Sequence, residues 1–149
     1  MVLNDKRSAY LAEQVSMFLL TFLWVYAASS KLLAFRTFEI QMYRQAMPQE
    51  LAFLVIWTLP AIEILAAILL LIPKTRLAGF YLSFVLLCLF TGYIALAVFH
   101  FFENVPCSCG GVLRMLGWKE HLIFNTFFLL LSFTGIYTIN RERRLICTH

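Results

Sequence analysis

The sequence predicts an all-α integral membrane protein, in which four transmembrane helices form an antiparallel bundle with two short interfacial amphipathic segments. Hydrophobic residues make up 62% of the 149-residue chain and charged residues only 13%. This is too little charge for the surface of a soluble domain of this length. Four apolar runs are also long enough to cross the hydrocarbon core of a bilayer. We therefore expect one membrane domain over residues 1–149.

Short polar connections separate the four predicted spans, which cover residues 15–33, 51–72, 77–102 and 122–139. The first run is also compatible with a signal peptide, because Ala27-Ala28-Ser29 provides the small residues that cleavage requires. We interpret it as the first transmembrane helix instead. Pro60 interrupts the second run and should kink that helix, since proline removes one backbone hydrogen bond.

Two shorter segments mix apolar and charged side chains. The first covers residues 35–47 and ends at Pro48, and the second covers residues 112–118. This mixture is typical of short helices that lie in the headgroup layer of a membrane.

The distribution of lysine and arginine predicts the orientation of the bundle. Seven of these residues lie on the side that holds both chain ends and the short basic turn at residues 73–76, against five on the other side. The positive-inside rule then places both termini in the cytoplasm. In a bacterium, where we expect this protein, the membrane is then the inner membrane. The net charge of +4 is spread over ends and loops, which indicates contact with lipid headgroups and not with nucleic acid.

The most specific stretch is Pro106-Cys107-Ser108-Cys109-Gly110-Gly111, just after the third apolar run. The orientation above puts this loop in the periplasm, where disulfides persist. The Cα atoms of Cys107 and Cys109 would be about 7 Å apart in an extended chain, whereas a disulfide needs roughly 4.4–6.8 Å. The chain must bend to close so small a ring, and a strained disulfide is easier to reduce. We therefore rank redox exchange ahead of a static disulfide.

Basic side chains near this loop would favour the reactive thiolate form of the cysteines. The residues that we expect there are His100, His121, Lys31 and Lys119. A third interpretation is a zinc or copper site formed by the two thiolates with His100 and His121. Its spacing matches no standard zinc pattern, so we predict no metal.

Glu63 is a carboxylic acid near the middle of the second run. A charge at this depth costs about 2.5–3.5 kcal/mol on insertion scales, so the side chain should face the bundle interior. It could form a proton or quinone-headgroup site, or an interhelical hydrogen bond to Ser29, Ser30, Thr91 or Tyr93. Lys31 would be an ion-pair partner if it turned inward, although a lysine near a helix end more often extends toward the membrane surface.

Two further polar residues and two further cysteines could have either a functional or a structural role. His121 and Asn125 are four residues apart and share a helix face, so together with His100 they could line the mouth of the bundle beneath the cysteine loop. The alternative is that they anchor helix ends at the interface. We expect Cys88 to be a small packing residue, and Cys147 to be incidental.

Five stretches of the chain match a known pattern: Ser29-Ser30-Lys31-Leu32-Leu33 with Phe35 and Phe38, Glu63 with the aliphatic run to Ile72, residues 106–111, Leu116-Gly117-Trp118, and residues 120–125. Together they resemble the DoxX/MauE-like group of small four-helix membrane proteins. The cysteine loop resembles the redox-associated MauE-like branch. The resemblance implies a four-helix bundle and a link to periplasmic thiol-disulfide chemistry, in which such a protein helps disulfide-rich partners to mature. The residues themselves do not identify methylamine metabolism.

Our first hypothesis is a thiol-disulfide oxidoreductase of the inner membrane. Cys107 and Cys109 would exchange with a periplasmic thioredoxin-like or disulfide-bearing protein, and a quinone held between the helices could accept the electrons. His100, His121, Asn125, Lys31 and Glu63 would support this site.

A second hypothesis is a non-catalytic accessory subunit of a larger membrane complex, with a structural disulfide in the loop. A transporter that uses Glu63 is a weaker third hypothesis, because the chain has no sign of inverted repeats.

Overall fold

The computed structural model describes residues 2–45, 48–98 and 118–147. They form five helices, namely α1 (Val2–Leu33), α2 (Phe35–Tyr43), α3 (Gln49–Leu71), α4 (Arg76–Val98) and α5 (Trp118–Cys147). The long helices α1, α3, α4 and α5 each contain a stretch that is long and apolar enough to span a membrane. The described chain contains no strand. The predicted all-α membrane fold is therefore confirmed.

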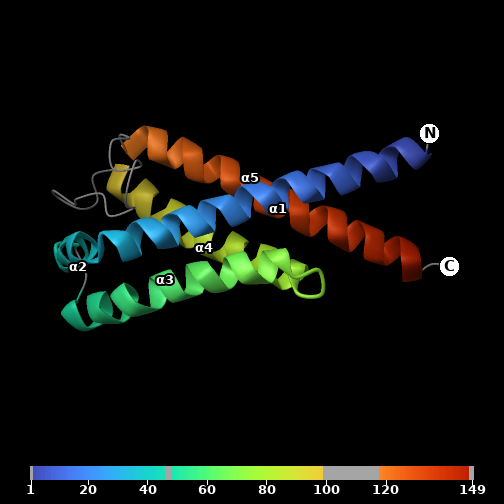
Figure 1. Cartoon of the computed structure of the whole chain (residues 1–149). Helices are drawn as coiled ribbons and strands as arrows, with labels where there is room; N and C mark the ends of the chain where they lie inside the picture. Colours follow the sequence, from blue (N-terminus) through green and yellow to red (C-terminus); the bar gives the residue numbers. More distant parts are fainter. Residues whose placement is uncertain (1, 46–47, 99–117, 148–149) are drawn as a thin grey trace.

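The four long helices run alternately up and down, so that each one packs against two antiparallel neighbours (Figure 1). The contacts join α1 to α3, α3 to α4, α4 to α5 and α5 back to α1. Both chain termini lie at one end of the bundle, while the short helix α2 lies at the other end, across the direction of α1 and α3 (Figure 1). We call this second end the α2 end. It also holds the last turn of α4 and the first turn of α5.

Two helices are longer than the apolar runs that predict them. Helix α1 begins at Val2 instead of residue 15, and α5 continues to Cys147 beyond residue 139. The added segments hold no proline or glycine and contain several good helix formers, such as alanine, glutamate, lysine and arginine. A hydropathy pattern detects the part of a helix that crosses the membrane and not its polar continuation.

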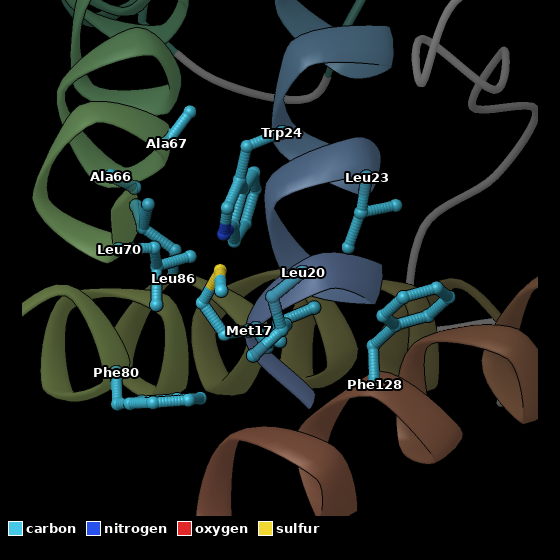
Figure 2. Close-up of a cluster of buried hydrophobic side chains, with 11 residues drawn as sticks. Met17, Leu20, Leu23, Trp24, Ala66, Ala67, Leu70, Phe80, Leu86 and Phe128 are labelled. Carbon is cyan, nitrogen blue, oxygen red and sulfur yellow. The ribbon is translucent and has the colours of Figure 1, made fainter. Parts of the chain in front are cut away.

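The main hydrophobic core fills the middle of the bundle (Figure 2). Its buried members come from all four long helices: Met17, Leu20, Leu23, Trp24, Ala66, Ala67, Leu70, Phe80, Leu86, Leu87 and Phe128. Trp24 is the largest of them, and its indole Nε1 donates a hydrogen bond of 2.8 Å to Ser83 Oγ. This buried bond links α1 to α4 across the bundle, and it satisfies the polar atom of an otherwise apolar side chain.

Two glycines allow helices to approach closely. A Cβ atom at Gly135 would lie 2.2 Å from Phe80 Cε1, so the Phe80 ring packs directly on the α5 backbone. A Cβ atom at Gly79 would lie 2.7 Å from the backbone nitrogen of Leu70, where α3 and α4 meet beside their connecting turn. Glycine is the residue that permits such close contact between helices in a membrane.

Candidate functional site at the α2 end

A buried ion pair joins α1 to α3. Lys31 Nζ lies 2.8 Å from Glu63 Oε1, and the two side chains are only 5% and 1% exposed. Lys31 therefore turns into the bundle instead of extending toward the membrane surface, which corrects the expectation for a lysine so close to a helix end. The donor that the structure gives Glu63 is Lys31, and not one of the hydroxyl groups that the sequence offered as alternatives.

The hydrogen bonds around this pair are incomplete. Lys31 Nζ makes a second hydrogen bond, of 3.2 Å, to the carbonyl oxygen of Ala27, which uses two of its three donors. Glu63 Oε2 is buried and has no hydrogen-bond partner among the residues that the structure describes. Because burial removes both charges from water, a pair of this kind is stable only when most of its polar atoms find partners. One donor and one carboxylate oxygen remain available here.

Aromatic side chains from α2 and α3 lie on one side of the pair. The Phe38 ring centroid is 6.0 Å from Lys31 Nζ, a distance at which an ammonium group still interacts with the face of an aromatic ring. Phe35 follows at 6.5 Å from Phe38, and Trp57 at 5.3 Å from Phe35, between ring centroids. Phe38 is buried, Phe35 is half-buried and Trp57 is 61% exposed. The series of rings therefore leads from the outer surface of the bundle to the ion pair.

Helix α2 is held in place by contacts with α3 and α4. Its buried residues Phe38 and Met42 pack against Ile56 of α3, and the Tyr93 hydroxyl of α4 donates a hydrogen bond to Gln45 Oε1 just after α2. The exposed side carries Arg36, with an ion pair of 3.8 Å to Glu39. This helix is amphipathic, as predicted. Sequence reasoning missed Gln45, because a single amide after an amphipathic segment carries no recognisable signal.

His121 and Asn125 lie one turn apart on α5, and both are buried. His121 Nδ1 has no hydrogen-bond partner in the described part of the chain, and the His121 ring centroid lies 6.4 Å from that of Phe124. The shared helix face agrees with the spacing in the sequence. Among the described residues, no hydrogen bond or ion pair connects these two side chains to Lys31 or Glu63. Toward the α2 end, the described residues thus include buried polar side chains at Lys31 and Glu63, at Gln45, and at His121 and Asn125.

Residues 8–138 of the chain match the model of the family described as methylamine utilisation protein MauE. The chain belongs to the MauE family. The match includes all of α2, α3 and α4 and most of α1 and α5. No curated protein and no solved structure gives a significant match.

Three of the predicted site residues of this MauE-family protein lie outside the described residues. They are Cys107, Cys109 and His100, so the redox role of the cysteine pair stays a prediction. The predicted interfacial segment at residues 112–118 also falls there, apart from Trp118, where α5 begins. The connection that contains both cysteines joins the end of α4 to the start of α5, and these two helix ends lie at the α2 end (Figure 1).

The structure also corrects one expectation about thiols in this MauE-family chain. Cys88 is a free cysteine on the exposed surface of α4, whereas the sequence predicts a packing residue inside the bundle. An exposed position is possible because a thiol is apolar enough to face lipid. Within the described ranges, no three His, Cys, Asp or Glu side chains gather as metal ligands do.

Proposed function

We propose that this MauE-family protein supports disulfide formation in partner proteins outside the cytoplasm, through thiol-disulfide exchange at Cys107 and Cys109. The support is the position of the cysteine connection. It joins the last turn of α4 to the first turn of α5 at the α2 end, where the described residues include the buried polar side chains of Lys31, Gln45, His121 and Asn125. The proposed location is the bacterial inner membrane, with both termini in the cytoplasm and the cysteine loop in the periplasm. The family description points to methylamine utilisation as the setting.

The proposed reaction exchanges bonds between sulfur atoms. A thiolate of the partner attacks one sulfur of the Cys107–Cys109 disulfide, which gives a mixed disulfide and releases the other cysteine as a thiolate. The second partner thiolate then resolves the mixed disulfide. The partner loses two electrons and two protons, and the cysteine pair gains them as a dithiol. We propose a quinone dissolved in the membrane as the oxidant that restores the disulfide and is itself reduced to the quinol. A thioredoxin-like or disulfide-bearing periplasmic protein is the proposed partner.

The second candidate function is a non-catalytic accessory subunit of a larger membrane complex. Support comes from the described part of the chain, which consists of membrane-spanning helices and the short helix α2. In that case the cysteine pair would hold the loop in shape and would not cycle.

Redox trapping in intact cells distinguishes the two functions. Cells are quenched with acid, and thiols are labelled with a membrane-impermeant mass tag before and after reduction. Exchange predicts a mixture of dithiol and disulfide at Cys107 and Cys109 that responds to added oxidant and reductant. A pair that stays fully oxidised under all conditions contradicts exchange and favours the accessory subunit. Labelling of these cysteines from the cytoplasmic side alone contradicts the proposed orientation.

A further inference from the structure

We propose that the Lys31–Glu63 ion pair and the neighbouring aromatic rings form the binding site for the headgroup of a lipid-soluble quinol. This inference deepens the proposed function, since it rests on that function for the role of the ligand as the reduced form of the electron acceptor. The binding site itself consists of described residues only. It lies among α1, α2 and α3, and its aromatic members are Phe38, Phe35 and Trp57.

The unused hydrogen-bonding groups of the pair match a hydroxyl group. One N–H of the Lys31 ammonium remains after its bonds to Glu63 and Ala27, and within the described ranges the buried Glu63 Oε2 has no hydrogen-bond partner. A hydroxyl accepts one hydrogen bond and donates another, so a single phenolic hydroxyl can satisfy both groups. A carbonyl oxygen only accepts and would leave Oε2 without a donor. The site should therefore bind a quinol more tightly than the corresponding quinone.

The net charge of the Lys31–Glu63 pair and its position in the membrane restrict the chemical class of the ligand further. The charges of Lys31 and Glu63 cancel, so the pair favours a neutral ligand over an anion or a cation. The pair is buried within the segment of α3 that spans the membrane, where a charged or strongly hydrated ligand would have to lose its water at high cost. A neutral molecule that already dissolves in lipid avoids this cost.

The three rings provide a path from lipid to the ion pair. Trp57 is 61% exposed on the outer surface, while Phe38 is 4% exposed beside Lys31. Aromatic side chains bind an aromatic headgroup by stacking or edge contacts. A flat ring can therefore move along Trp57 and Phe35 with its isoprenoid tail in the bilayer.

Helix α2 closes the site, and its displacement opens it. This helix has only nine residues, and its first turn has no side-chain cap at Ala34. A helix this short has little stability of its own, so it depends on the packing of Phe38 and Met42 against Ile56. Movement of α2 away from α3 withdraws Phe38 from the ammonium, and the quinol ring takes its place there.

Binding of decylubiquinol and decylubiquinone to the purified full chain tests this inference. The protein is placed in phosphatidylcholine nanodiscs, and empty nanodiscs correct for partition into lipid. We expect the quinol to bind at least about tenfold more tightly than the quinone, a difference that one hydrogen bond to a charged group supplies. In Glu63→Gln this preference should fall to about twofold or less, because a glutamine amide can donate a hydrogen bond to a carbonyl or accept one from a hydroxyl. Trp57→Ala, which leaves the ion pair intact, should weaken binding of both forms.

Two control variants test whether a change in binding comes from this site or from an effect elsewhere in the protein. Glu13→Gln breaks the ion pair of 2.9 Å with Arg76 near the opposite end of the bundle, and it should leave the quinol preference unchanged. Cys107→Ser/Cys109→Ser should also bind as wild type does, so that binding and thiol exchange are judged separately. Equal affinity for quinol and quinone in wild type overturns the inference. So does a preference that Glu63→Gln retains, or one that Glu13→Gln also abolishes. If binding fails while the cysteines still cycle, the proposed function stands with another electron acceptor.

Discussion

Lys31 Nζ and Glu63 Oε1 lie 2.8 Å apart inside a membrane bundle, although the two residues are 32 positions apart in the sequence. The pair connects the last turn of α1 to the interior of α3. It is the most deeply buried ion pair among the described residues.

Removal of one partner of this pair should cost more than removal of both. Lys31→Met leaves a buried carboxylate without its ammonium, and breaking a buried pair costs about 3–5 kcal/mol. Lys31→Met/Glu63→Leu replaces both charges by apolar groups, which is often close to neutral. We expect the free energy of unfolding in mixed micelles to fall for the single variant and to recover in the double variant. Equal losses in the two variants would contradict the close coupling of these charges.

Gly135→Ala should destabilise the bundle by about 1–3 kcal/mol, the usual cost of overpacking. The reason is that its new methyl group would overlap the Phe80 ring. Gly92→Ala is the matched control, since a Cβ atom there meets nothing within 4 Å. Thermal unfolding of the two variants in the same detergent provides the comparison. Phe80→Leu combined with Gly135→Ala should recover part of the loss, and an unchanged midpoint for Gly135→Ala alone would argue against this packing.

Ser83→Ala should destabilise the core by about 1–3 kcal/mol, because the buried Trp24 indole N–H then loses its acceptor. The combination Trp24→Phe/Ser83→Ala removes donor and acceptor together. It therefore separates the lost hydrogen bond from the loss of indole volume when it is compared with Trp24→Phe alone. If the hydrogen bond matters, Ser83→Ala should cost much less in the Trp24→Phe background than in wild type. The unfolding free energies of the four proteins form a complete cycle.

Tyr93→Phe should loosen α2 without unfolding the four long helices. The substitution removes the hydroxyl that donates to Gln45, while the contacts of Phe38 and Met42 with Ile56 remain. Hydrogen exchange of the amides of residues 35–45 should therefore accelerate, with little change in the middle of α3 and α4. Uniform acceleration over the whole bundle would indicate a global loss of stability instead.

Cys109→Ser or Cys107→Ser should trap a mixed disulfide with the oxidised form of the proposed periplasmic partner. In this reverse direction of the exchange, the remaining loop thiol attacks the partner's disulfide, and the second loop thiol that would release the reduced partner is missing. Which single variant accumulates the adduct identifies the attacking cysteine. Non-reducing electrophoresis of proteins from acid-quenched cells detects the adduct, and mass spectrometry identifies the partner. Absence of an adduct in both variants, together with normal function of Cys107→Ser/Cys109→Ser, would support the accessory-subunit alternative.

Much of the fold can be predicted from composition and spacing alone. The four apolar runs predict the four spanning helices because backbone groups in lipid must be satisfied within helices. The mixture of apolar and charged residues at 35–47 predicts the amphipathic helix α2, because such a helix is apolar on one face and polar on the other. The polar ends of α1 and α5 are helical beyond the predicted limits, since hydropathy carries no information about helix outside the membrane.

Composition and residue spacing were sufficient to predict the all-α membrane fold, the four spans, and the inward direction of Glu63. Each follows from the cost of exposing polar groups or charge to lipid, which depends on one residue or one helix at a time. Three-dimensional packing was needed to establish that Lys31 pairs with Glu63, that the Tyr93 hydroxyl donates a hydrogen bond to Gln45, and that Cys88 faces outward. These relationships depend on how each helix is rotated about its axis and on which helices become neighbours. Long-range packing decides both, and no local pattern of residues encodes them.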